Sequence, residues 1–447
     1  MKKYRVLSTL LTLLLLTGIF TPFSSSAANA PQVTAQRAIL VDANYDEILY
    51  EKDAHQKAAP ASITKVMTAL LVCEAIEEGT LSPETVVTAS ETALSNLHSN
   101  GSTANIKAGE EIDVRNLLYC LLLPSANEAA NILAETVCGN TADFVEKMNQ
   151  RAQELGCSNT HFANPHGLDQ DGHYTTAYDI YLFTKEAMTH PLFQEIVSTK
   201  MYDMPATNLS KARRFYNTNS LLSTWYYLGY TYDKAIGVKT GTTDNAGCCL
   251  VSAAKDGDDY LICVVLGAEV IKIDNTSVPR QFSESRDLLK WGFSNFRRVT
   301  ISRGDTPVTQ VAVTLSQDAD SVMLKPVGEF SCTLPVDVST DDIDSSIELF
   351  QESIAAPVEE GQILGSMTLS YAGKVYGTLD LVATNSVERS EFLYRKAQVM
   401  EFFSQSGTKL ILAFIGILAA AILLKVFVFT KRRRPTKRRH YNGRRRY

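Results

Sequence analysis

The chain has 447 residues, of which 45% are apolar and 21% charged, and this composition excludes a fibrous, collagen-like or wholly disordered protein. Its formal net charge is −6, but residues 31–409 carry 29 basic against 49 acidic side chains, a net charge of −20. The acidic charge of residues 31–409 argues against a nucleic-acid-binding core, because phosphate binding needs a basic surface.

Residues 1–30 have the three parts of a secretory signal peptide. Three basic residues lie within the first five positions, Val6–Phe20 is apolar, and small residues follow as far as Ala30. The apolar stretch is short for a membrane span, so an uncleaved anchor is the weaker alternative. The cleavage position, after Ala30 or two to three residues earlier, stays open.

Alternating and helical patterns divide residues 31–296 into short strands and helices. Ala38–Asp42 and Glu47–Glu51 indicate two strands around a turn, and apolar residues from Ile63 to Leu71 recur at helical spacing. Farther on, three runs separated by turn residues predict antiparallel strands: Ala235–Lys239, Cys249–Ala254 and Tyr260–Leu266. A closing helix is predicted over Asp287–Phe296. We therefore expect a domain of mixed helices and antiparallel strands.

The composition changes after residue 296. Residues 297–385 are rich in Val, Thr and Ser, with alternating runs such as Val308–Leu315, and are expected to form a small β-rich domain. Residues 386–409 have the spacing of an amphipathic linker helix. Leu410–Thr430 is almost wholly apolar and long enough to form a transmembrane helix.

The last 17 residues, 431–447, hold ten of the 43 Lys and Arg side chains. Under the positive-inside rule this basic tail stays in the cytoplasm, which places residues 31–409 on the extracytoplasmic side of the cell membrane. Contact with anionic lipids explains the tail more simply than binding of nucleic acid does. We expect a single-pass membrane protein that binds no nucleic acid.

Eight cysteines lie on the exported side of this expected span. No Cys-x-x-Cys pair or Cys/His cluster has the spacing of a metal site, so no metal centre is predicted from them. A disulfide between Cys120 and Cys138 stays open, because sequence alone cannot establish connectivity.

Ser62-Ile63-Thr64-Lys65 places a hydroxyl and an amine on one face at the start of the first helix. Serine is a strong nucleophile only when a base takes its proton, and lysine is a base only when burial or a nearby cation lowers its pKa. The motif is weak evidence by itself, because roughly one such pattern is expected by chance in a chain of this length. A solvated helix start would look the same.

Two further segments carry groups of related chemistry. Ser125-Ala126-Asn127 lies between two helical runs, where Ser125 can relay a proton and the Asn127 amide can bind a peptide backbone. Lys239-Thr240-Gly241 closes a predicted strand and offers a positive charge, a hydroxyl and room for a substrate. Taken singly, the first segment would be interpreted as a helix cap and the second as a plain strand end.

Together the three segments resemble the active site of the penicillin-binding proteins and serine β-lactamases, whose motifs occur in this order. The flanking residues are similar to those of the low-molecular-weight D-alanyl-D-alanine carboxypeptidases, the serine peptidases that trim peptidoglycan stem peptides. Three segments carry the likeness, which covers about residues 35–296 closely: Ala59–Thr68, Asn164–Asp169 and Gly237–Thr243. The rest of the chain fits that family's layout more loosely.

The resemblance implies an α/β (α+β) catalytic domain of the β-lactamase/transpeptidase type over residues 31–296, with a helical insert that holds Ser125. Ser62 would attack the carbonyl between the two terminal D-alanines with Lys65 as general base, and water would hydrolyse the acyl-enzyme. Ser125 would complete the proton network, and the N–H groups of Ser62 and Thr242 would form the oxyanion hole. The implied substrate-binding residues are Asn127, Lys239, Thr240, Gly241 and Thr242.

The implied partners are a peptidoglycan stem peptide ending in D-Ala-D-Ala, β-lactams as covalent inhibitors, and the cytoplasmic membrane through the C-terminal helix. No metal or organic cofactor is required.

A class A β-lactamase is disfavoured, because that family uses a deacylating Glu in its own loop and the only acids within Cys157–Tyr178 are Asp169 and Asp171. A penicillin-sensing or wall-binding module, and endopeptidase or transpeptidase activity on the same fold, are retained as alternatives. His166 and His173 are interpreted as structural.

Overall fold

The computed structural model describes residues 30–95, 97, 101–273 and 276–431. The expected signal peptide and basic tail lie outside these ranges, apart from residues 30 and 431. The described chain divides into two compact units. The first runs to Ile301 and also takes in Ser331–Asp342, and the second contains the remaining residues from Ser302 onward.

A five-stranded antiparallel sheet forms the centre of the first unit. Its order is β2-β1-β9-β8-β7, so strands from the start of the unit pair with strands from its end. Side chains alternate across each strand, so Ile39 and Val41 enter one core while Ala38 and Leu40 enter the other. The strands are β1 (Arg37–Asp42), β2 (Glu47–Lys52), β7 (Ala235–Thr243), β8 (Gly247–Asp256) and β9 (Asp259–Ala268).

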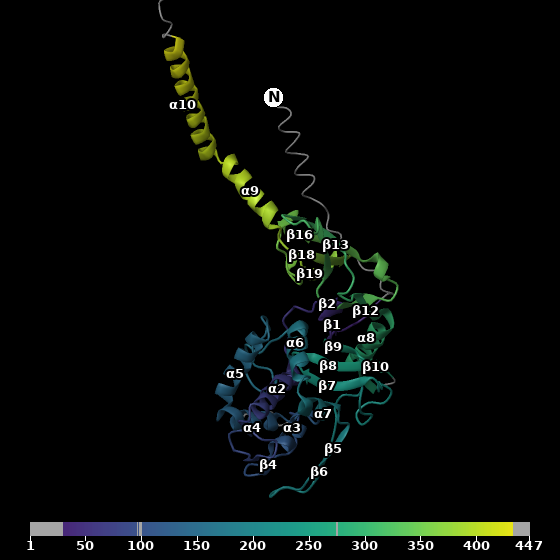
Figure 1. The fold of residues 1–447 in the computed structure, drawn as a ribbon. Coiled ribbons are helices and arrows are strands. Elements are labelled where there is room, and N and C mark those ends of the chain that lie inside the picture. Colours follow the sequence, from purple (N-terminus) through teal and green to yellow (C-terminus); the bar gives the residue numbers. More distant parts are fainter. Residues whose placement is uncertain (1–29, 96, 98–100, 274–275, 432–447) are drawn as a thin grey trace, which may run out of the picture. The chain divides into compact units, whose positions relative to one another are not determined.

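Helices cover both faces of this sheet (Figure 1). On one face, α8 (Gln281–Asn295) packs through Phe282, Leu288 and Leu289. On the other face lie α2 (Thr64–Glu77) and α6 (Ala177–Ala187). Eleven of the fourteen residues of α2 are buried, which makes it a central helix surrounded by protein rather than an amphipathic surface helix.

The segment between α2 and α6 is mainly helical. Asp113 and Asn140 cap two of its helices by accepting hydrogen bonds from backbone N–H groups. Ser125 lies in the short loop between α3 and α4, as the sequence predicts. The elements of the segment are β3 (Val86–Thr88), β4 (Glu111–Asp113), α3 (Val114–Leu122), α4 (Asn127–Cys138) and α5 (Thr141–Glu154).

Smaller elements complete the first unit. The paired strands are β5 with β6, β10 with β11, and β12 with β15. Their bounds are β5 (Met201–Met204), β6 (Arg213–Tyr216), β10 (Val270–Ile273), β11 (Thr276–Pro279), β12 (Phe296–Ser302) and β15 (Phe330–Pro335). One helix and two 3-10 turns remain: α7 (Pro191–Ser198), η1 (Ala61–Ile63) and η2 (Thr340–Asp342).

The second unit is rich in β-structure, as its composition predicts. Its six-stranded sheet has the order β16-β18-β19-β14-β13-β17. The strands are β13 (Thr309–Thr314), β14 (Ser321–Pro326), β16 (Asp344–Leu349), β17 (Ser353–Ala355), β18 (Ile363–Tyr371) and β19 (Lys374–Ala383). Helices α9 (Glu391–Ser404) and α10 (Ser406–Lys431) follow, and Ser406–Phe429 is long and apolar enough to cross a membrane.

Two expected boundaries were wrong. Strand β7 continues to Thr243 because it pairs with β8 as far as Gly247, so Lys239-Thr240-Gly241 lies inside a strand and not at its end. Helix α8 starts at Gln281, six residues earlier than expected. Its first turn is polar, and the buried Glu284 there accepts hydrogen bonds from the backbone of Thr34 and Ala35, which an apolar pattern cannot show.

Cys120 and Cys138 are both unbridged, so the disulfide left open between them is not formed. Cys120 is buried on α3, where its Sγ contacts Met204 Sδ at 3.7 Å. Burial raises the pKa of seven of the eight thiols, which keeps these seven groups protonated and chemically quiet: Cys73, Cys120, Cys138, Cys157, Cys248, Cys249 and Cys263.

Candidate active site

The three sequence motifs meet in one cleft with a volume of about 300 Å³. They reach it from the turn η1, from the loop between α3 and α4, and from strand β7 at the edge of the sheet. The motif residues that line the cleft are Ser62, Ser125, Thr240, Gly241 and Thr242. The other three, Lys65, Asn127 and Lys239, are buried.

Two glycines allow the backbone segments to approach Ser62 closely. A Cβ atom on Gly241 would lie 3.1 Å from the Ser62 nitrogen and 3.0 Å from the Ala61 Cβ, so only glycine lets β7 pack this tightly against η1. A Cβ atom on Gly167, whose φ is +91°, would lie 1.9 Å from the Ala61 carbonyl oxygen. Strand β7 and the loop around Gly167 therefore both pack against the turn that carries Ser62.

Lys65 is the central hydrogen-bonding group of the site. Its Nζ lies 2.8 Å from Ser62 Oγ, 2.8 Å from Asn127 Oδ1 and 2.6 Å from the backbone oxygen of His166. The last two partners are carbonyl oxygens, which can only accept. A neutral amine has two hydrogens and one lone pair, so donation to both carbonyls leaves the lone pair for the Ser62 hydroxyl. The arrangement matches a serine that donates its proton to a lysine base.

Two buried lysines set the electrostatics. Burial, together with the positive charge of Lys239, holds the pKa of Lys65 well below its usual range, and the carboxylate of Glu128 opposes this shift. Burial also lowers the pKa of Lys239 to about 7. Desolvation is the leading cause at both sites, because it disfavours the charged amine. Both shifts favour the neutral form of the amine.

Ser125 lies in the loop between α3 and α4, and Asn127 lies at the start of α4. The two side chains make different contacts in the site. Asn127 begins α4, and its side chain orients Lys65 directly through Oδ1. The Ser125 hydroxyl is buried and has no hydrogen-bond partner among the described residues, while the Ser125 backbone has the unfavourable φ of +66°. Strained residues and unpaired buried hydroxyls are concentrated at functional sites.

The segment Asn164–Gly167 packs against the start of α2 through hydrogen bonds. Asn164 Oδ1 accepts a hydrogen bond from the Gly167 N–H at 2.7 Å, and the Pro165 oxygen accepts one from Thr68 Oγ1 at 2.6 Å. This places the His166 carbonyl against Lys65. Sequence reasoning gave His166 a structural interpretation and missed the role of its backbone oxygen, which no side-chain pattern reveals.

His173 is a structural residue in this arrangement. Burial lowers its pKa to about 4, so the imidazole is neutral. The Ala163 N–H donates to His173 Nδ1, which leaves Nε2 to donate to Thr64 Oγ1 at 2.9 Å. Thr64 Oγ1 then donates to the Ala61 oxygen at 2.9 Å, so the chain of hydrogen bonds fixes η1.

A further cleft residue that sequence reasoning missed is Thr218, whose hydroxyl lies 2.7 Å from that of Thr240.

The acids between Cys157 and Tyr178 are committed elsewhere or lie outside the reaction cleft. Asp169 accepts hydrogen bonds from Thr243 Oγ1 at 2.8 Å and from the Asn245 N–H at 3.4 Å. Neither Asp169 nor Asp171 lines the cleft that contains Ser62. The structure thus offers no carboxylate from this loop for a β-lactamase type of deacylation.

Two families match the chain. Residues 24–270 match the family described as D-alanyl-D-alanine carboxypeptidase, and residues 296–389 match the C-terminal domain of penicillin-binding protein 5. The D-alanyl-D-alanine carboxypeptidase DacF of Bacillus subtilis is 31% identical, over 87% of this chain and 96% of that protein. The D-alanyl-D-alanine carboxypeptidase DacC of Escherichia coli is 32% identical, over 84% and 91%.

Solved structures agree with this assignment. Penicillin-binding protein 5 from Haemophilus influenzae matches with a TM-score of 0.65 and 29% identity, over 81% of this chain and 99% of that one. The DD-transpeptidase of Streptomyces K15 matches with a TM-score of 0.53 and 31% identity, over 60% of this chain and 99% of that one. The expected fold class is confirmed: a transpeptidase-type catalytic domain with a helical insert, then a small β-rich domain and an apolar C-terminal helix.

Proposed function

The chain belongs to the D-alanyl-D-alanine carboxypeptidase family of serine peptidases, and we propose that it removes the terminal D-alanine from peptidoglycan stem pentapeptides through an ester on Ser62. One observation carries the assignment of the nucleophile. Ser62 Oγ lies 2.8 Å from a buried lysine whose two other partners are carbonyl oxygens. A neutral Lys65 therefore has its lone pair directed at the hydroxyl proton.

In the acylation step, Ser62 Oγ attacks the carbonyl carbon of the penultimate D-alanine while its proton passes to Lys65 Nζ. The N–H groups of Ser62 and Thr242 stabilise the negative charge on the carbonyl oxygen. The C–N bond then breaks, and the proton passes through the unpaired Ser125 hydroxyl to the amine of the departing D-alanine. An ester on Ser62 and a neutral Lys65 remain.

In the deacylation step, water attacks the ester and gives a proton to Lys65, and the Ser62 oxygen leaves and takes that proton back. The shortened peptide is released with a new carboxylate. A β-lactam would follow the same first step, and its opened ring would remain attached to Ser62. This accounts for covalent inhibition by penicillins without any additional group.

Strand β7 supplies the substrate-binding surface. Among the described residues it pairs with β8 alone, and the free edge of a strand can pair with an extended peptide. Thr240, Gly241 and Thr242 line the cleft along this strand, and Lys239 is buried within it. The hydroxyls of Thr240 and Thr242 would hold the terminal carboxylate, with the positive charge of Lys239 favouring an anion, and Asn127 would hold the peptide backbone.

Residues 31–296 are assigned to catalysis in this proposal, and 297–385 to the β-rich domain. The apolar span of α10 would anchor the protein in the cytoplasmic membrane. The many basic residues after it would remain in the cytoplasm, which leaves the cleft on the side where peptidoglycan lies. Residues 1–30 would direct export.

The activity is tested with the full-length protein in detergent. We expect stoichiometric release of D-alanine from a stem pentapeptide, and a mass increase of one β-lactam per chain after brief exposure to penicillin. An acceptor peptide and a crosslinked muropeptide distinguish the alternatives: transpeptidation would form a new peptide bond, and endopeptidase activity would cut the crosslink. Labelling without D-alanine release would favour a penicillin-sensing module and contradict the carboxypeptidase proposal.

The acylation rate should fall as the pH drops through the pKa of Lys65, because only the neutral amine accepts the Ser62 proton. Lys239→Gln removes the positive charge that lowers the Lys65 pKa, so this pKa rises and the acidic limb of the pH–rate profile moves to higher pH. Lys239→Arg keeps a positive charge and serves as the matched control. Acylation rates with fluorescent penicillin across pH check this, and an unmoved limb in Lys239→Gln would contradict it.

A further inference from the structure

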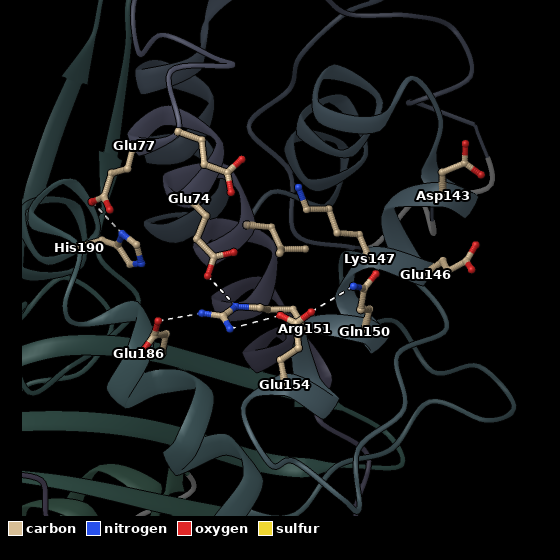
Figure 2. Close-up of a pocket in the computed structure, with 12 residues that line it drawn as sticks. Glu74, Glu77, Asp143, Glu146, Lys147, Gln150, Arg151, Glu154, Glu186 and His190 are labelled. Atoms are coloured by element: carbon tan, nitrogen blue, oxygen red, sulfur yellow. Dashed lines mark hydrogen bonds and ion pairs between the residues drawn. The ribbon is translucent and has the colours of Figure 1, made fainter.

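A second cluster of ionisable side chains surrounds a larger cavity of about 810 Å³, away from the cleft (Figure 2). Helices α2, α5 and α6 and the residue before α7 supply its wall. Seven carboxylates line it against only Lys147 and Arg151, so its formal charge is −5 with histidine neutral. Such a wall attracts cations.

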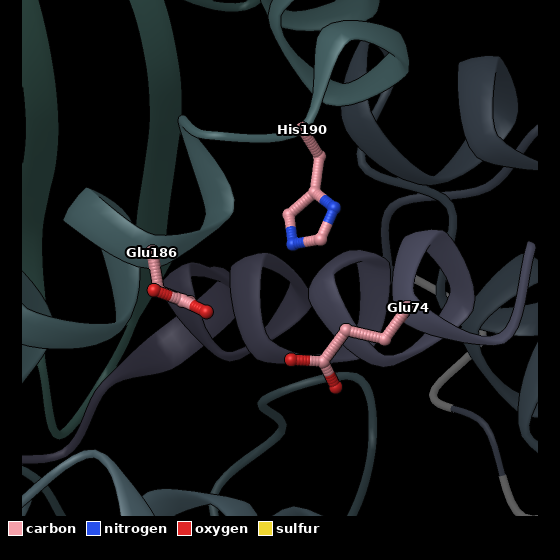
Figure 3. Close-up of side chains that lie close together, drawn as sticks. All are labelled: Glu74, Glu186 and His190. Atoms are coloured by element: carbon pink, nitrogen blue, oxygen red, sulfur yellow. The ribbon is translucent and has the colours of Figure 1, made fainter. Parts of the chain in front are cut away.

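Three potential metal ligands converge in this cavity (Figure 3). One ligand atom each from Glu74, Glu186 and His190 lies within 4.8 Å of the others. Glu74 belongs to α2, Glu186 to α6, and His190 is the N-cap residue of α7. Three elements that are separate in the chain therefore meet at one point.

His190 has an unsatisfied nitrogen at this point. The residue is 7% exposed, and its Nδ1 lies 2.8 Å from Glu77 Oε1. Donation from Nδ1–H to that carboxylate leaves a lone pair on Nε2, which is buried and has no hydrogen-bond partner among the described residues. A buried polar atom without a partner is costly, and a histidine held by a carboxylate through its other nitrogen is the usual geometry of a metal ligand.

Arg151 orients the two carboxylates without filling their capacity. Its Nε donates to Glu74 Oε1 at 2.7 Å and its Nη2 to Glu186 Oε1 at 2.8 Å. Each carboxylate thus uses Oε1 for the guanidinium and keeps Oε2 for another partner. No hydrogen bond joins the guanidinium to His190 Nε2, so this lone pair has no donor among the described residues.

We propose that His190 Nε2 and the free oxygens of Glu74 and Glu186 bind one Zn²⁺ ion, with Glu77 holding the imidazole in place. A set of one imidazole and two carboxylates suits Zn²⁺, whereas Ca²⁺ and Mg²⁺ prefer oxygen ligands alone. Zn–ligand bonds are about 2.0–2.2 Å long, so the three side chains close inward around the ion. The ion would tie α2, which follows Ser62 directly, to α6 and α7, and its three protein ligands would leave a fourth position for water.

The test uses the full-length chain in detergent, freed of metal with EDTA and then titrated with Zn²⁺ alone in a calorimeter. We expect one His190-dependent site and a higher melting temperature with Zn²⁺. His190→Gln should weaken this binding at least tenfold, and Glu77→Gln about tenfold or more through loss of the orienting contact. The matched control is His55→Gln, which removes an exposed histidine that also lies beside a glutamate, at 3.6 Å from Glu51. It should leave the affinity unchanged.

Labelling of every variant with fluorescent penicillin shows that the fold is intact, and Glu186→Gln replaces any His190 variant that does not label. Co²⁺ added to the metal-free wild type supplies an independent readout, with visible absorption bands that Zn²⁺ displaces. The proposal is overturned if the wild type binds no Zn²⁺, or if His190→Gln and His55→Gln bind it with equal affinity. Arg151 alone would then complete the cluster.

Discussion

Ser62→Ala is expected to abolish covalent labelling by fluorescent penicillin and to reduce D-alanine release to background, a loss on the order of 10⁶-fold. The reason is chemical, because the substitution removes the cleft hydroxyl that lies 2.8 Å from Lys65 Nζ. Ser125 lines the same cleft, but its Oγ has no hydrogen bond to Lys65 and hence no base directed at it. Intact-protein mass spectrometry after β-lactam exposure and an assay for free D-alanine measure the two losses.

The control for this experiment is Ser285→Ala. Ser285 is a buried serine on α8 that does not line the cleft, so the same atom is removed at a distance from Ser62. We expect labelling and D-alanine release close to those of the wild type. An adduct on Ser62→Ala, mapped by peptide digestion to another residue, would show that the nucleophile was assigned wrongly.

Lys65→Gln should slow acylation by about 10²- to 10⁴-fold, the usual contribution of a general base. Glutamine keeps an amide donor near Asn127 Oδ1 and the His166 oxygen, so the wall of the cleft remains hydrogen-bonded, but it cannot take the Ser62 proton. Noncovalent binding of the β-lactam should change far less than the acylation rate. Stopped-flow traces over a range of β-lactam concentrations separate the two quantities.

Lys52→Gln is the matched control for the lysine variant. Lys52 Nζ also donates to two backbone oxygens, those of Val33 and Ala35 at 2.9 and 2.7 Å. Lys52 lies on β2, at the edge of the sheet opposite β7, and does not line the cleft. Its replacement should lower the melting temperature without slowing acylation. If Lys65→Gln acylates at the rate of Lys52→Gln, then another group removes the Ser62 proton, and the role given to Lys65 is wrong.

The two buried lysines explain why the site depends on its surroundings. Lys65 and Lys239 would each be cationic in water at neutral pH, and burial lowers both pKa values. The positive charge of Lys239 lowers the pKa of Lys65 further, so the surroundings favour a neutral Lys65 next to Ser62. A bound carboxylate would restore the positive charge on Lys239, which links substrate binding to the electrostatics of the base.

Much of the fold was predictable from local patterns. Alternating residues located β1, β8 and β9, and the apolar stretch near the C-terminus located the long apolar helix α10. The extension of β7 through Thr243 was missed because strand length depends on the partner strand. The buried, polar start of α8 was missed because Glu284 is satisfied by backbone N–H groups from the other end of the domain.

The sequence by itself determined which reactive groups the protein has and in which order, because side-chain identity and local periodicity are properties of the chain. Only the tertiary structure decided that the pKa of Lys65 lies well below its usual range. That pKa depends on burial of the amine, on the positive charge of Lys239 and on the opposing charge of Glu128. Electrostatic energy depends on distance and burial in space, and neither quantity follows from separation along the chain.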